Sequence, residues 1–164
     1  RILWLIAVMK IFGIGGKIPL AKTARRRKKT FQSKKEALQR FTSGRGIFKS
    51  WSSEFVEAYL DCGLLERDSQ TAILKCDPEL EAQIFESVPI DVWKYAAKIV
   101  CPVLAIRGEH SDVFAVESSE RLKFLIADYD LATIADAGHF VPMGKPEECA
   151  QVIKEFIRRK LRAA

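Results

Sequence analysis

The sequence predicts an α/β protein in which a mainly helical region is followed by alternating strands and helices of a parallel sheet. Residues 99–106 form a continuous apolar run rich in β-branched side chains, which is typical of a strand buried on both faces. Residues 130–134 form a second short run of this kind. An amphipathic segment, 118–126, lies between them, and residues 146–161 carry the clearest helical pattern in the chain. This order predicts two parallel strands joined by a crossover helix.

The region before residue 99 predicts helices between recognisable start and stop signals. Ser33 and Glu36 have the spacing of a capping box. Asp77 precedes a proline, and proline suits the first turn of a helix. A short extended piece is predicted at residues 71–74. The predicted helices cover residues 2–12 and 34–41, a segment capped by Ser52 or Ser53 and stopped by Gly63, and a segment opened by Asp77-Pro78 with Leu80, Ile84 and Val88 at helical spacing.

Composition favours a globular protein over a disordered one, because 48% of the 164 residues are hydrophobic and 29% are charged. The net charge is +6, and much of the excess lies in the run 25–29. This run has no interleaved aromatic residues, so it predicts a solvated face, with binding of nucleic acid or anionic lipid as the weaker alternative. The apolar opening stretch is interrupted by lysines and glycines, so we expect no membrane span.

The cysteines and histidines predict neither a disulfide framework nor a metal site. None of the four cysteines lies in a Cys-x-x-Cys motif, and there are only two histidines, His110 and His139. Scattered thiols of this kind favour a reducing compartment, so we expect a cytoplasmic protein without a metal or another cofactor.

Two polar loops follow the predicted strands. The first contains Glu109 and Asp112, and the second contains His139. Ligands bind beside the carboxyl ends of the strands in an open α/β sheet, so we expect the two loops to be neighbours. An imidazole that removes a proton from a nucleophile, and a carboxylate that holds the imidazole in place, are what a nucleophilic hydrolase needs.

Residues 99–158 resemble the closing segment of the α/β-hydrolase family, through Val103-Leu104-Ala105-Ile106-Arg107-Gly108, an acidic loop, Ala137-Gly138-His139-Phe140-Val141-Pro142 and the helix at Pro146-Glu147-Glu148. The resemblance implies the C-terminal portion of an α/β-hydrolase fold, with a helical cap over residues 1–95 and the end of the core over 96–164. It also implies that His139 is the catalytic base and Asp112 the acid, with Glu109 as the weaker candidate. The family's acid commonly lies three residues after the glycine, and that position is Ser111 here.

A pocket for a small hydrophobic substrate is expected under the cap. Residues 44–51 resemble a cap segment of some members of the family, and Phe48, Trp51 and Phe140 are the candidate pocket residues. Ordinary packing between cap helices is the alternative for each of these rings, and for Phe55 and Tyr59.

The nucleophile is absent from the chain, since neither a Gly-x-Ser-x-Gly elbow nor a His-Gly oxyanion segment occurs in it. The sequence also begins at Arg1. We therefore expect the C-terminal fragment of a longer hydrolase, inactive alone, with the neighbours of its strands supplied upstream. Ester hydrolysis is the first expectation. The alternatives are epoxide, haloalkane or carbon–carbon bond hydrolysis, or a non-catalytic relative that binds a partner, and the oligomeric state is left open.

Overall fold

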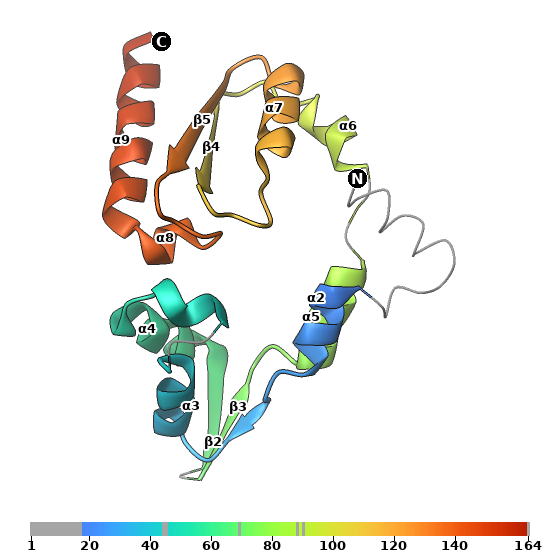
Figure 1. Ribbon diagram of the computed structural model, residues 1–164, viewed down its shortest axis with the longest axis vertical. Helices are drawn as coiled ribbons and strands as arrows, with labels where there is room; N and C mark the ends of the chain where they lie inside the picture. Colours follow the sequence, from blue (N-terminus) through green and yellow to red (C-terminus); the bar gives the residue numbers. More distant parts are fainter. Residues whose placement is uncertain (1–17, 44–45, 69, 88, 90, 164) are drawn as a thin grey trace. The chain divides into compact units, whose positions relative to one another are not determined.

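The computed structural model describes residues 18–43, 46–68, 70–87, 89 and 91–163 (Figure 1). The chain divides into two compact units: unit 1 contains Arg1–Ser43 and Val56–Asp91, and unit 2 contains Gly44–Phe55 and Val92–Ala164. The helix predicted over residues 2–12 lies outside the described residues. The division into a cap and a core at residue 95 stays a prediction.

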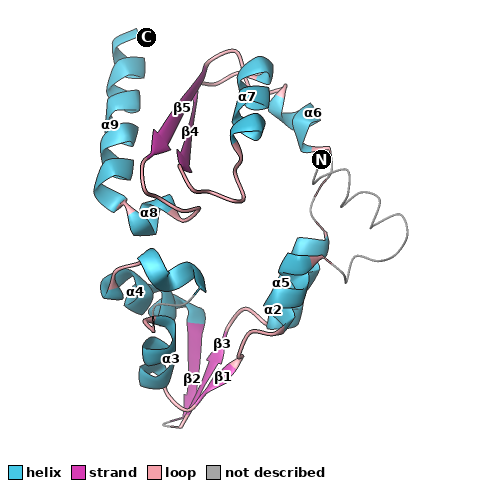
Figure 2. Ribbon diagram, in the orientation of Figure 1, coloured by secondary structure: helices cyan, strands magenta, loops and turns pink. Residues whose placement is uncertain are grey.

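Unit 1 combines short helices with a small antiparallel sheet (Figure 2). Its sheet has the strand order β1-β3-β2. The helix predicted over 34–41, the helix predicted between the Ser52 or Ser53 cap and Gly63, and the extended piece at 71–74 are confirmed. Helix α2 and strands β1 and β2 were not predicted. The elements are α2 (Pro19–Arg25), β1 (Thr30–Phe31), α3 (Lys34–Phe41), α4 (Ser53–Gly63, which begins in unit 2), β2 (Leu64–Asp68), β3 (Thr71–Leu74) and α5 (Pro78–Glu86).

The predicted capping residues begin α3 and α5. The Oγ atom of Ser33 accepts a hydrogen bond from the backbone N–H of Glu36, at 3.1 Å. The carboxylate of Glu36 reaches back to the backbone N–H of Gln32, at 2.7 Å, one residue before the position that a capping box requires. The carboxylate of Asp77 accepts from the N–H of Glu79, at 2.8 Å. Each cap satisfies an N–H group that has no partner inside its own helix.

Small residues let α5 pack against α2. The buried residues in this contact are Ile18, Ala21, Ala24 and Ala82, with Phe85 packed against them. The predicted helix is confirmed, but Leu80 and Ile84, two of the apolar residues at helical spacing, are 53% and 55% exposed. Alanine permits close approach of two helices and leaves little hydrophobic signal in a sequence, which is why the buried face was missed.

The basic run is paired with acidic side chains inside unit 1. Arg25 bonds to Glu79 at 2.8 Å and to Glu86 at 2.6 Å, and Arg27 bonds to Glu81 at 2.5 Å. Further along the run, Lys28 pairs with Glu36 and Lys29 with Asp77. The face is therefore exposed, as expected, but much of its positive charge is locally compensated.

Unit 2 holds the parallel strands. Strands β4 (Val103–Gly108) and β5 (Tyr129–Ile134) pair in parallel from Val103 opposite Tyr129 to Gly108 opposite Ile134. The predicted order of strand, helix, strand and helix is confirmed. Strand β4 begins after Pro102, which has no N–H to give to a sheet, and therefore later than predicted. The other elements are η2 (Gly46–Ser50), α6 (Val92–Ala96), α7 (Val116–Leu125), α8 (Val141–Gly144) and α9 (Pro146–Ala163).

The strand pair lies between α7 and α9 (Figure 1). Its core contains Ile134, Ala137, Val141 and Cys149, with Ile106 and Val152 packed against them. The apolar residues of the helix predicted over 146–161 are only partly covered: Cys149 is buried, whereas Ile157 and Leu161 are 48% and 75% exposed. Unit 2 therefore presents apolar surface that the described residues leave open. None of the helices in the described part of the chain has the length and apolar character that a bilayer crossing requires.

Candidate active site at the carboxyl ends of β4 and β5

Backbone hydrogen bonds join the two polar loops. Gly108 ends β4 opposite Ile134, which ends β5, so both loops leave the same edge of the sheet. The N–H of Glu109 donates to the carbonyl of Ile134, and the N–H of His110 donates to the carbonyl of Ala137, both at 2.9 Å. The loops are neighbours, as the sequence predicted.

Gly108 is required by this close approach. A Cβ atom at this position would overlap the carbonyl oxygens of Ala137 and Gly138. Only glycine allows the two backbones to come this close, so the end of β4 sets the position of the chain that leads into His139.

Among the residues that the structure describes, Ser111 is the one whose side chain lies within hydrogen-bond distance of the imidazole of His139. Its Oγ atom lies 3.3 Å from Nδ1 of His139. Asp112 is exposed, and in the part of the chain that the structure describes no hydrogen bond or ion pair joins it to His139. The assignment of Asp112 as the acid stays a prediction, and the nearer residue is the one at the family's usual acid position.

The side chain of Arg107 stabilises the loop that carries Ser111. This side chain is 7% exposed. Its Nε atom donates to the carbonyl of Phe114 at 3.1 Å, and Nη2 donates to the carbonyl of Glu109 at 3.2 Å. Ser111 Oγ also accepts the N–H of Phe114, at 3.1 Å. Arg107 therefore fixes both ends of the segment that presents Ser111.

Glu109 supports the other loop rather than the imidazole. Its carboxylate accepts the N–H of Asp136 at 3.1 Å. Asp136 has φ 53°, a left-handed conformation that aspartate tolerates better than most residues. His110 Nε2 lies 3.9 Å from a carboxylate oxygen of Asp136. The exposed side chains of Glu109, His110 and Asp136 have possible metal-ligand atoms within 4.8 Å of one another. Among the described residues, this is the cluster whose composition and spacing could hold a metal ion.

The three candidate pocket residues lie together beside His139. The ring of His139 packs edge-on against Phe140, with centroids 5.2 Å apart. Phe140 packs against Trp51 at 5.6 Å, and Trp51 against Phe48 at 5.0 Å. Phe48 is buried, Trp51 and Phe140 are half-buried, and His139 is exposed. The rings form a continuous aromatic row that leads to the imidazole.

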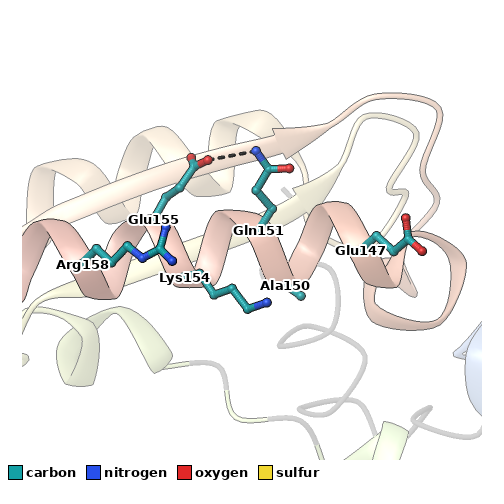
Figure 3. Close-up of a pocket in the computed structure, with 6 residues that line it drawn as sticks. All are labelled: Glu147, Ala150, Gln151, Lys154, Glu155 and Arg158. Atoms are coloured by element: carbon teal, nitrogen blue, oxygen red, sulfur yellow. Dashed lines mark hydrogen bonds between the residues drawn. The ribbon is translucent and has the colours of Figure 1, made fainter.

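A shallow hollow along α9 does not belong to this site (Figure 3). Its side chains all project from the exposed face of one helix, and Gln151 donates to Glu155 at 2.9 Å within it. A hollow without an opposing wall gives a ligand little enclosure. Its lining residues are Glu147, Ala150, Gln151, Lys154, Glu155 and Arg158.

Comparison with solved structures identifies the fold. The chain aligns with E-2-(acetamidomethylene)succinate hydrolase at TM-score 0.70 and 19% identity, over 85% of this chain and 50% of that one. It aligns with the peroxisomal alpha-beta-hydrolase Lpx1 of Saccharomyces cerevisiae at TM-score 0.76 and 14% identity, over 90% and 41% of the two chains. An esterase of M. tuberculosis matches at TM-score 0.67 and 10% identity, over 93% and 51%. No protein-family model and no curated protein sequence matches the chain.

The chain has the C-terminal portion of an α/β-hydrolase fold, as the sequence predicted. It spans about half the length of the solved structures that it matches.

Sequence reasoning missed the contacts of Ser111 and Arg107. The position of Ser111, three residues after the glycine, was a usable signal, but a serine there does not look like an acid. Arg107 lies within an apolar strand, where an arginine is buried only if its N–H groups find partners, and those partners become visible only in the structure.

Proposed function

We propose that this chain is the histidine-bearing part of a hydrolase that cleaves esters of small hydrophobic compounds. The observation that carries the proposal is the place of His139, exposed at the carboxyl end of β5 with the aromatic row of Phe140, Trp51 and Phe48 beside it. An imidazole next to an apolar surface suits a base that works on an uncharged, apolar substrate.

The nucleophile of the proposed reaction comes from the remainder of a longer protein. As it attacks the ester carbonyl carbon, its proton passes to His139, which then gives a proton to the departing alcohol. His139 next takes a proton from water, and the resulting hydroxide attacks the carbonyl carbon of the covalent intermediate. The bond from that carbon to the nucleophile then breaks, the acid is released, and His139 returns its proton to the nucleophile. The reaction uses no cofactor. The exposed apolar side chains of unit 2, such as Phe124 at 91% and Leu161 at 75%, support a fold that is completed by further chain.

Partners other than a small molecule are not part of the proposal. The ion pairs of Arg25, Arg27, Lys28 and Lys29 leave less free positive charge for nucleic acid than the sequence suggests. The described cysteines are free thiols, in keeping with a cytoplasmic protein.

The test compares hydrolysis of a short-chain aryl ester by the protein extended upstream of Arg1 and by two variants of it. His139→Ala should lower kcat about 1000-fold or more, because base catalysis is lost. His110→Ala is the matched control, since it removes the other histidine from the same edge of the sheet, and it should leave the rate unchanged. Equal rates for His139→Ala and the unsubstituted protein would rule out the proposed role.

The pocket is tested separately. Trp51→Ala should raise KM for esters with long apolar acyl groups and leave acetyl esters little affected, because the aromatic row contacts only the longer groups. An equal loss for both kinds of ester would contradict a substrate-binding role for Trp51.

A non-catalytic α/β-hydrolase-like binding protein is the second candidate. The observation that favours it is the hydroxyl, rather than a carboxylate, next to Nδ1 of His139. A folded, extended protein that cleaves no ester, epoxide or haloalkane would favour this second function.

A further inference from the structure

We infer that Ser111 is the positioning residue for His139, and that its hydroxyl donates a hydrogen bond to Nδ1, which leaves the imidazole proton at Nε2. The consequence for catalysis rests on the proposed function, whereas the hydrogen bond and the ring proton can be tested without it.

The inferred direction of the hydrogen bond is the one that uses the hydrogen of the Ser111 hydroxyl, since the contact itself is compatible with either donor. Oγ accepts the backbone N–H of Phe114 at 3.1 Å and lies 3.3 Å from Nδ1 of His139. A hydroxyl has one hydrogen to donate and two lone pairs. When it accepts from Phe114 and donates to Nδ1, both its hydrogen and a lone pair are used. The accepted bond also polarises the hydroxyl and makes it a better donor.

A carboxylate in the same place would have the opposite effect. It can only accept, so it would draw the imidazole proton to Nδ1 and leave the lone pair of Nε2 free to receive the proton of a nucleophile. The serine also carries no charge with which to stabilise an imidazolium. This chain therefore keeps an oriented histidine, but the tautomer with a bare Nε2, which the proposed base needs, becomes the minor one, and the serine adds no charge that stabilises the imidazolium.

The charged groups of the two loops do not replace that carboxylate. Glu109 binds the N–H of Asp136, and His110 faces the Asp136 carboxylate at 3.9 Å. Asp112 is exposed and lies one residue beyond Ser111. Arg107 holds the loop through the carbonyls of Phe114 and Glu109, which favours Ser111 as the side chain presented to His139.

The experiment measures the ring-nitrogen chemical shifts of the histidines by NMR, in the full chain labelled with nitrogen-15 on histidine. The chain has two histidines, so a His110→Gln variant assigns both sets of signals. These shifts distinguish a protonated ring nitrogen from a bare one. The variants are Ser111→Ala, Ser111→Thr, Ser111→Asp and Asp112→Asn, and unchanged His110 signals show that the loops remain folded.

In the unsubstituted chain, we expect the proton of His139 at Nε2 and a hydrogen-bonded, bare Nδ1. Ser111→Ala should move the Nδ1 signal toward that of an unbonded nitrogen, and Ser111→Thr should restore it. Ser111→Asp should raise the ratio of Nδ1–H to Nε2–H by about tenfold or more, because a hydrogen bond from Nδ1–H to a charged carboxylate is stronger than one from a serine hydroxyl to Nδ1. Asp112→Asn should change nothing.

Three results would overturn the inference. The first is a proton at Nδ1 in the unsubstituted chain. The second is a His139 signal that responds to Asp112→Asn and not to Ser111→Ala, which would make Asp112 the partner. The third is hydrolysis of an aryl ester by the chain alone that Ser111→Ala abolishes, since Ser111 would then be a nucleophile.

The same aspartate variant separates this inference from the proposed function. In the extended protein, Ser111→Asp should raise kcat and leave KM unchanged. If the ring proton moves to Nδ1 but kcat does not rise, the role of Ser111 is supported and the proposed hydrolase function fails.

Discussion

A Cβ atom placed on Gly108 would lie 2.7 Å from the carbonyl carbon of Ala137 and would overlap its oxygen. Gly108→Ala should therefore push the His139 loop away from β4 and cost about 1–3 kcal/mol of unfolding free energy. Gly138→Ala is the control, because a Cβ on Gly138 meets nothing within 4 Å. Urea unfolding followed by circular dichroism measures both variants. Similar stabilities for the two would contradict the close approach.

Loss of the Arg107 side chain should loosen the Ser111 loop more than the sheet, because both of its hydrogen bonds go to that loop. Arg107→Ala removes two partly buried hydrogen bonds, to Phe114 and to Glu109, and should cost about 1–3 kcal/mol. Amide exchange at Phe114 should also accelerate, because its N–H is held by Ser111 Oγ in that loop. The exposed Lys123 supplies the control, and Lys123→Ala should leave this amide unaffected. Unaltered exchange at Phe114 in Arg107→Ala would show that the loop is held by other contacts.

Acid should weaken unit 1 through three carboxylates paired with the basic run. The pKa of Glu36 is lowered by the hydrogen bond from Lys28 and by that from the Gln32 backbone. Lys29 lowers the pKa of Asp77, and Arg25 lowers that of Glu79. Because the folded-state pKa values lie below the ordinary ones of 4.5, 3.8 and 4.5, their contribution to stability is present above those values. It is lost as the pH falls through the folded-state values.

Unfolding followed at a series of pH values between 6 and 2, in low and in high salt, measures this effect. The loss on acidification should be smaller in high salt, because the pairs are exposed and already screened. The triple substitution of Glu36, Asp77 and Glu79 by glutamine or asparagine should flatten the low-salt profile. An unchanged profile in that variant would assign the acid sensitivity to other groups.

Exposed apolar side chains on unit 2 should make the chain prone to self-association. Phe124 is 91% exposed on α7. Phe124→Ser should reduce association, as measured by sedimentation, with a change in unfolding free energy within about 0.5 kcal/mol. Phe31→Ser is the contrast, because Phe31 is 1% exposed and its loss should destabilise unit 1. Equal association of the Phe124 variant and the unsubstituted chain would mean that this side chain takes no part.

The sheet of unit 2 and the meeting of its loops could be predicted because both depend on local patterns. An apolar run such as residues 103–106 favours a strand, and these residues form a half-buried part of β4. Once two strands are parallel, the loops that follow them must leave the same edge, so the approach of the two loops follows from the order of elements. The row from Phe48 to Phe140 was suggested by the family resemblance rather than by spacing.

The remainder depends on contacts between distant residues. Strand β2 is exposed along most of its length, so it lacks the alternation that would reveal it. The partners of the basic run lie on α3 and α5, and no local pattern pairs Arg25 with Glu79. Whether Ser111 or Asp112 meets His139 is decided by the path of a short loop and by the buried Arg107, which a motif does not specify.

Unit 1 is built from two separate stretches of chain, because residues 44–55 belong to unit 2. Phe31 of β1 pairs with Ala72 of β3 across that whole excursion, whereas β4 and β5 are separated by α7 and the loops on either side of it. Closing a longer loop costs more entropy and slows folding. During synthesis, the first stretch of unit 1 leaves the ribosome well before the strands that complete its sheet. Less chain is therefore synthesised between β4 and its partner β5 than between β1 and its partner β3. On connectivity alone, we expect β4 and β5 to pair sooner after β4 emerges than β1 and β3 do after β1 emerges.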